Sequence, residues 1–184
     1  MKRLFFLLFL SLFMGMNSKA QNQDNANGKL PIQTKILDFV IGVTTSDEVK
    51  NYCNSNPDKE WEEDKTDNSI SVTDLRFGGC YWDITFFSFH KGVLTDVNFM
   101  AIDTENVSKA EIKSNWEKLK RNLTKKYASY LVKELSKEDL LFFTDDKTAI
   151  FLQISNKDSR RTLDLTYKDV QLTFTQQEDE EGEL

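Results

Sequence analysis

The residue types that carry out most protein chemistry are sparse in this chain. It has two cysteines, Cys53 and Cys80, and a single histidine, His90. Nucleophilic catalysis with a cysteine–histidine or serine–histidine pair would need His90 as its base. His90 directly precedes Lys91-Gly92, a turn signal between two strand-like runs, and a hairpin tip is a poor place for a desolvated base. We therefore expect His90 to be an exposed turn residue, and we expect no catalytic residue.

Motifs for metals and cofactors are also missing from the sequence. Zinc sites need clustered cysteines and histidines, which the chain does not have. The acidic run Glu60–Asp64 lacks the spacing and the glycine of a calcium loop, and is typical of a solvated charged loop. Within it, Trp61 is either a core anchor for the loop or an exposed contact, and we favour the core. Gly78-Gly79 lies between two strand-like runs, so it is not a phosphate-binding loop. We expect no metal and no cofactor.

The N-terminus has the pattern of a cleavable signal peptide at residues 1–20. A basic pair is followed by the apolar run Leu4–Met16 and then by the small-residue cleavage motif Ser18-Lys19-Ala20. The apolar run is shorter than the roughly 20 residues of a spanning helix. The first cysteine after it is Cys53, too distant for a lipid anchor. We expect a chain that is exported, periplasmic or secreted after cleavage near Ala20, and not membrane-spanning.

Export has consequences for charge and for the cysteines. The lost segment holds three basic residues and no acidic ones, so cleavage changes the net charge from −6 to −9. Such a negative surface repels nucleic acids and anionic lipids, and we exclude both as partners. In an oxidising compartment Cys53 and Cys80 are a candidate disulfide. The alternative is two buried thiols, and the sequence leaves both open.

The remaining pattern predicts a single α+β domain at residues 35–175, between a flexible leader at 21–34 and an acidic tail at 176–184. Thr45 and Ser108 begin capping boxes, and each precedes a helical pattern. The apolar run Lys35–Val43 is a short strand or a docking segment. The predicted helices begin at 46 and 109, residues 54–68 form a loop, and the predicted strands are 69–77, 80–89, 93–101, 139–144, 148–155 and 161–167, with 170–175 as a further strand or an extension.

The order of these elements repeats. The two caps are 63 residues apart, and each of the two turn signals that follow the first cap recurs 67 residues later, at 145–146 and 158–159. We interpret this as two tandem helix–strand–strand–strand repeats, residues 35–101 and 107–175. The strands would form an antiparallel sheet with both helices packed on one face.

Three segments resemble a family of small exported proteins from Bacteroides-like bacteria. They are the opening Phe39–Val49 (FVIGVTTSDEV), the strand pair Phe89–Phe99 (FHKGVLTDVNF) and the closing Leu163–Asp169 (LDLTYKD), with Trp116, Leu119 and Tyr127 in the helix between. The opening lacks the first glycine of the family pattern. The resemblance covers most of residues 36–169. It implies a fold similar to the β-lactamase inhibitor protein and to the small lipoprotein of the outer-membrane barrel assembly machinery.

Aromatic residues on the predicted sheet are the one feature that points to a function. Neighbouring strand residues point to opposite faces, so one face would pack against the helices and the other would carry aromatic side chains. Unbroken alternation assigns Tyr81, Phe87 and Phe89 to that other face. An exposed aromatic face is typical of a binding surface, although curvature, the leader or a dimer mate could instead cover it.

These observations favour an exported, non-catalytic binding or interaction module of the bacterial cell envelope. Its partner would be another protein or an envelope component. The alternative is a periplasmic small-molecule or peptide carrier with an enclosed apolar pocket between helix and sheet. An enzyme is the least favoured class, and the sequence does not determine the oligomeric state.

Overall fold

The computed structural model describes residues 31–104, 107–157 and 160–182. The chain divides into two units, Met1–Leu30 and Pro31–Leu184, and only the second contains described residues. The expected signal peptide, most of the leader and the predicted turn at 158–159 lie outside the described residues. The second unit is α+β, as predicted from the sequence. Its helices and strands, in chain order, are β1 (Lys35–Ile36), β2 (Phe39–Val40), α2 (Ser46–Asn54), β3 (Trp61–Asp64), β4 (Ser69–Phe77), β5 (Cys80–His90), β6 (Val93–Ile102), α3 (Lys109–Tyr127), the 3-10 helix η1 (Ala128–Tyr130), β7 (Leu140–Thr144), β8 (Thr148–Lys157), β9 (Arg160–Asp169) and α4 (Val170–Gly182).

Both predicted helix starts are confirmed. Thr45 and Glu48 form a reciprocal capping box, in which the Thr45 hydroxyl accepts from the Glu48 amide and the Glu48 carboxylate accepts from the Thr45 amide. Ser108 caps α3 by accepting from the Glu111 amide at 3.2 Å. These side chains satisfy helix amides that would otherwise lack a partner. The apolar run at 35–43 forms the two-stranded sheet β1–β2.

The glycine turn between β4 and β5 also positions α3. Gly78 and Gly79 have φ angles of +63° and +74°, a conformation that side chains resist. A Cβ on Gly78 would lie 3.1 Å from Leu119 of α3. Lys118 Nζ donates to the Gly79 carbonyl at 2.6 Å. The turn therefore contacts the helix of the second half of the domain.

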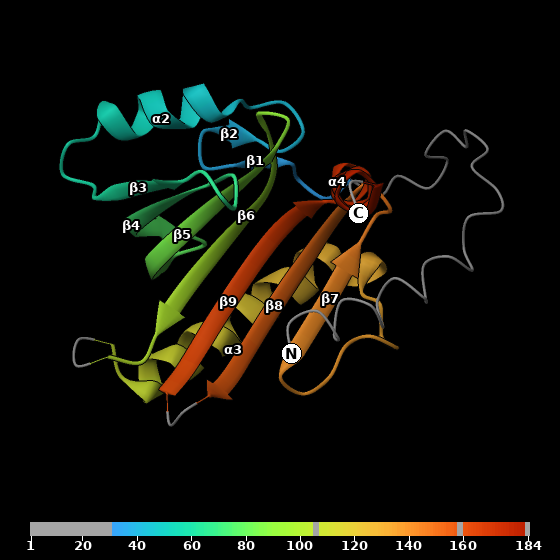
Figure 1. Cartoon of the computed structure of the whole chain (residues 1–184). Coiled ribbons are helices and arrows are strands. Elements are labelled where there is room, and N and C mark those ends of the chain that lie inside the picture. Colours follow the sequence, from blue (N-terminus) through green and yellow to red (C-terminus); the bar gives the residue numbers. More distant parts are fainter. Residues whose placement is uncertain (1–30, 105–106, 158–159, 183–184) are drawn as a thin grey trace, which may run out of the picture. The chain divides into compact units, whose positions relative to one another are not determined.

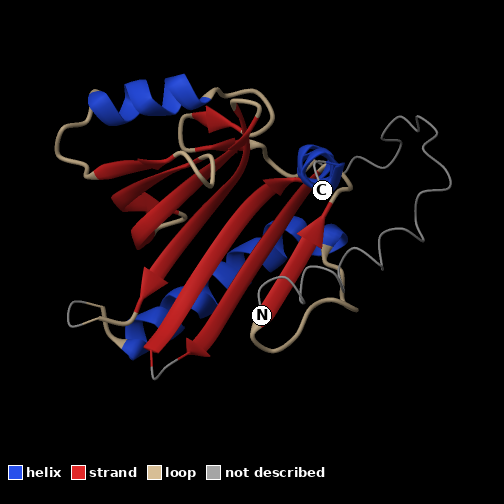
Figure 2. Cartoon of the chain, in the orientation of Figure 1, coloured by secondary structure: helices blue, strands red, loops and turns tan. Residues whose placement is uncertain are grey.

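Seven strands form one antiparallel sheet in the order β3-β4-β5-β6-β9-β8-β7 (Figures 1 and 2). We call α2 to β6 the first half and α3 to β9 the second half. Each half contains a three-stranded meander, β4–β6 or β7–β9, and the two meanders meet where β6 pairs with β9. In that pairing Val97 lies opposite Tyr167, and Phe99 opposite Leu165.

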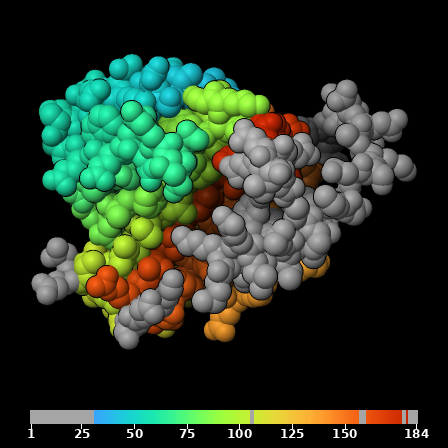
Figure 3. Space-filling model, viewed as in Figure 1, coloured from blue at the N-terminus to red at the C-terminus, as the bar shows by residue number. Residues whose placement is uncertain are grey.

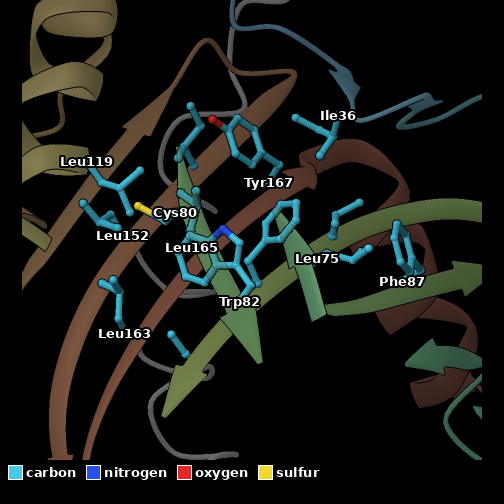
Figure 4. Packing of buried hydrophobic residues seen from close by; sticks show 14 of the residues in the cluster. Ile36, Leu75, Cys80, Trp82, Phe87, Leu119, Leu152, Leu163, Leu165 and Tyr167 are labelled. Carbon is cyan, nitrogen blue, oxygen red and sulfur yellow. The ribbon is translucent and has the colours of Figure 1, made fainter. Parts of the chain in front are cut away.

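The core lies between the sheet and the helices α2 and α3, which cover the same face. Residues of that face on β4 to β9 join the buried faces of both helices in one hydrophobic cluster (Figure 4). Phe39 contacts the ring of Phe87 edge-on at 5.2 Å near α2. Towards the middle of the sheet, the ring of Phe99 stacks on Phe77 at 4.6 Å and lies 5.5 Å from Trp82.

Two predicted segments are wrong. Residues 61–64, assigned to a loop, form the edge strand β3, which pairs with β4. Residues 170–175, predicted as a strand, begin the helix α4, which continues to 182 and so includes most of the predicted acidic tail. The side chain of Asp169 accepts from the Leu172 amide at 2.9 Å and starts that helix.

The described end of the predicted leader belongs to the folded domain. Ile32 is buried, and its amide donates to Asp145 Oδ2 at 2.7 Å. Lys126 Nζ donates to Gln33 Oε1 at 2.5 Å. Residues 31–34 are therefore packed against the second half rather than forming part of a free linker.

Candidate functional site

The sheet face turned away from α2 and α3 is the candidate site, and we call it the second face. Six neighbouring strands, β4, β5, β6, β9, β8 and β7, each contribute one residue to every cross-strand row. The three rows are Ser71, Phe86, Asn98, Thr166, Phe151 and Phe142; Ser69, Ser88, Asp96, Lys168, Ala149 and Thr144; and Thr73, Ile84, Met100, Asp164, Gln153 and Leu140.

The row that contains Phe86, which is the middle row of the three, places a polar pair between aromatic rings. Asn98 Nδ2 donates to Thr166 Oγ1 at 2.7 Å across the junction of β6 and β9. Phe86 lies next to Asn98 on one side and is half-buried. Phe151 lies next to Thr166 on the other side, with its ring 4.7 Å from that of Phe142. Rings therefore flank a hydrogen-bonding centre that spans the two halves.

The row that contains Ser88 carries two opposite charges next to each other. Asp96 and Lys168 are directly paired across β6 and β9, and Ser88 Oγ donates to Asp96 Oδ1 at 3.2 Å. Burial raises the pKa of Asp96, while the charge of Lys168 and the hydrogen bonds of Ser88 and Thr95 oppose the rise. Ser88, Asp96 and Lys168 therefore form one polar group across β5, β6 and β9.

The sequence assigned Tyr81, Phe87 and Phe89 to this face, and two of the three assignments are wrong. Tyr81 is 39% exposed, and its hydroxyl donates to Asp74 Oδ1, a hydrogen bond that raises the pKa of Tyr81 to about 12. Phe87 is fully buried and Phe89 is 4% exposed, both in the core. Of the phenylalanines of β5, Phe86 is the one that lies on the second face.

A change of phase within β4 and β5 explains the error. In β5 the buried positions are Cys80 and Trp82 and then, three residues after Trp82, Thr85. In β4 the same shift separates Val72 from Leu75, around Asp74, whose φ is +59°. The alternation therefore changes face between Trp82 and Thr85, so Tyr81 and Phe87 point to opposite sides. No residue type in this stretch predicts the change of face.

The only histidine lies at one end of the second face. His90 is the last residue of β5, and its side chain is 13% exposed, so the expectation of an exposed turn residue is wrong. Its Nε2 lies 3.0 Å from Asp179 Oδ2 of α4, and Lys91 Nζ lies 2.8 Å from the same oxygen. Lys91 and His90 hold the pKa of Asp179 below its usual value. The group acts as a contact between α4 and the β5–β6 hairpin.

The two cysteines are free thiols in the core. Cys53 lies on α2 and Cys80 begins β5, and each is buried in the hydrophobic cluster, of which Figure 4 shows the part around Cys80. Burial raises the pKa of both thiols. Of the two alternatives that the sequence leaves open, the structure has the buried thiols and not the disulfide.

The acidic run at 60–64 has structural partners. Glu63 pairs with Lys50 of α2 at 2.7 Å, and Asp64 Oδ1 accepts from the Thr66 amide at 2.8 Å. Trp61 is partly buried and packs against the core, as favoured from the sequence. Within the described ranges, no three His, Cys, Asp or Glu side chains are grouped so that they could hold a metal ion.

No protein-family model, curated protein or solved structure matches this chain. Among the helices of residues 31–104, 107–157 and 160–182, none is long and apolar enough to cross a membrane. The second face and the residues that form it are therefore the features of the molecule that point to a function.

Proposed function

We propose that this chain is an exported, non-catalytic interaction module of the bacterial cell envelope, which binds another protein through the second face. One observation carries the proposal: Phe86, Asn98, Thr166 and Phe151 lie in a single row across four adjacent strands. Interface cores are enriched in aromatic rings, and hydrogen-bonding groups among them set the register of a partner. Export rests on the signal-peptide pattern of residues 1–20.

The order of elements supports a fold resembling the β-lactamase inhibitor protein. A helix followed by a three-stranded meander occurs in both halves, with the short edge strand β3 added between α2 and β4, and the last strands of the two meanders pair with each other. In this proposal the halves are tandem repeats, and the row of Phe86 and Phe151 bridges them. Figure 3 views the molecule in the orientation of Figure 1, in which α3 lies behind β8 and β9.

The arrangement of charged groups favours binding over catalysis. The only histidine contacts Asp179, and the Asp96 carboxylate accepts a hydrogen bond from Ser88 and is influenced by the charge of Lys168. Each of these groups already serves a structural contact, which agrees with a surface that recognises a partner by shape and hydrogen bonding.

Site-specific photocrosslinking tests the proposal. The mature domain would carry a benzoylphenylalanine crosslinker at Phe86 or, as a control, at Arg121, which is exposed on the helix α3. In an envelope extract we expect a discrete protein adduct from position 86 and none from position 121. The substitution Asn98→Arg, which places a bulky charge in the middle row, should abolish the adduct, whereas Arg121→Glu should leave it. Equal adducts from both positions, or none from position 86, would refute the proposal.

A further inference from the structure

A second concave site, separate from the second face, lies beside α3. A cavity of about 480 Å³ opens between residues 113–120 of α3, the end of β8, the start of β9 and the segment that precedes β7. Its size falls in the range of roughly 300–1,000 Å³ that is typical of small-ligand sites. Trp116 of α3 and Ile154 of β8 contribute its apolar lining.

Unpaired charges of both signs surround this apolar lining. Three are basic and three acidic: Lys113, Lys120, Arg161, Glu117, Glu138 and Asp139. Among the described residues, none of these six side chains takes part in an ion pair. Lys120 Nζ lies 5.9 Å from the centre of the Trp116 ring, so a cation already stacks on the indole. Cationic and anionic groups that do not neutralise each other remain available to a ligand that carries both charges.

Four of the six charges lie towards two ends of the cavity, Arg161 and Lys113 at one and Glu138 and Asp139 at the other, whereas Glu117 and Lys120 follow Lys113 along α3. Arg161 marks one end, where its Nη1 donates to the Lys109 carbonyl at 3.3 Å and its Nε to Asn156 Oδ1 at 3.0 Å. Lys113 follows Lys109 by about one helical turn. Asp139 marks the other end, because its carbonyl accepts from the Ile154 amide at 2.9 Å. Ile154 and Asn156 are two residues apart on β8, which corresponds to about 7 Å.

We propose that this cavity binds a short peptide with free termini, of about two residues. Its carboxylate would lie at the end formed by Arg161 and Lys113, and its ammonium group at the end formed by Glu138 and Asp139. A free amino acid carries both charges on one Cα, whereas each added residue lengthens the separation by about 3.8 Å, which suits the spacing of the two ends. An apolar side chain of the peptide would contact Ile154 and the small exposed edge of Trp116, which is otherwise buried in the core.

The test uses L-leucyl-L-leucine as the probe and the indole N–H signals of the mature domain in NMR. The signal of Trp116 is assigned by its loss in Trp116→Phe. We expect a saturable shift of that signal with a dissociation constant between about 1 μM and about 1 mM. N-acetylation, C-amidation or replacement by free L-leucine should each weaken binding. Equal affinity for the capped peptides, an unaffected Trp116 signal, or no saturation would overturn the proposal.

Two exposed charges assign the orientation of the peptide. Lys113→Gln should weaken binding of the free peptide by about twofold to fivefold and leave the affinity for the C-amidated peptide unchanged. Glu138→Gln should weaken binding of the free peptide to a similar extent and leave the affinity for the N-acetylated peptide unchanged. The matched controls Lys125→Gln and Glu134→Gln remove exposed charges outside the cavity and should change neither affinity. Losses that do not depend on the free termini would contradict the proposed recognition.

Discussion

At the residue scale, Asp145 joins the start of the folded domain to the turn between β7 and β8. Its Oδ1 accepts from the amides of Lys147 and Thr148 at 3.2 Å and 2.7 Å, and its Oδ2 accepts from the Ile32 amide at 2.7 Å. A single carboxylate thus satisfies three backbone donors, and removal of the side chain would leave part-buried amides without a partner.

Asp145→Ala should lower the free energy of unfolding by about 1–3 kcal/mol, because a buried donor without a partner costs that much. Asp145→Asn keeps the Oδ1 acceptor and replaces only the oxygen that accepts from the Ile32 amide. It should therefore lower the free energy of unfolding by less than Asp145→Ala. Denaturant unfolding of the mature protein measures both. Equal stability of the wild type and the alanine variant would show that these hydrogen bonds add nothing to the fold.

The cysteines give a second prediction at this scale. Since Cys53 and Cys80 are free and buried, and burial raises the pKa of each thiol, neither should react with a thiol reagent in the folded protein. Both should react once the protein is unfolded in denaturant without a reductant. Mass spectrometry after alkylation counts the modified thiols. If neither thiol reacts in denaturant until a reductant is added, the mature protein carries a disulfide.

At the scale of elements, local signals determined what could be predicted. The caps at Thr45 and Ser108 and the turns at Gly78-Gly79 and Lys91-Gly92 act through neighbouring residues, so the sequence alone predicts the helices and the first meander. β3 was missed because WEED has the composition of a loop and becomes a strand only by pairing with β4. The second face was misassigned for a related reason, since the face change near Asp74 depends on how two strands twist together.

α4 illustrates how pairing overrides sequence preference. Val170–Thr175 alternates and is rich in β-branched residues, which favours a strand. However, β8 begins at Thr148, which pairs with Asp169, and the Lys147 carbonyl just before it accepts from the Val170 amide at 2.9 Å, so β8 has no residue left to pair with the chain beyond 170. Asp169 then caps a helix instead.

The contact of α4 with the β5–β6 hairpin leads to a prediction about exchange and pH. Asp179→Asn should speed amide hydrogen exchange in α4, because it removes the carboxylate that Lys91 and His90 contact. The lowered pKa of Asp179 means that the charged form favours the docked helix. Its contribution is present above the unfolded-state pKa of about 3.9 and is lost as the pH falls through the lower folded value. Protection of α4, corrected for intrinsic rates, should therefore decline below about pH 4.

A double variant serves as the control for this contact. Lys91→Gln alone should also speed exchange in α4, and adding it to Asp179→Asn should produce a smaller further change than it does alone. If the two effects are fully additive, the pair does not hold α4 on the hairpin.

At the scale of the whole domain, the joint between β6 and β9 makes the two halves depend on each other. Phe99 of the first half is fully buried, contacts Trp82 of its own half and pairs with Leu165 of the second. Phe77 touches both Phe99 and Tyr167. The second face depends on the same joint, since Asn98 and Thr166 meet there. A surface that spans both halves keeps its geometry only if the halves fold as one unit.

We therefore predict that the halves unfold in one transition and that Phe99→Ala destabilises both. Variants that retain only Trp82 or only Trp116 report on the first and the second half, respectively. In each variant, fluorescence and far-UV circular dichroism should give coincident denaturation midpoints, as two-state unfolding requires. Phe99→Ala should lower the free energy of unfolding by about 3–5 kcal/mol in both, because it opens a cavity in the shared core. Phe86 on the second face is half-buried, so Phe86→Ala should lower the free energy of unfolding by less than Phe99→Ala. If Phe99→Ala does not change the denaturation midpoint of the variant that retains only Trp116, the second half folds independently. The proposed surface across the joint would then lack a rigid base.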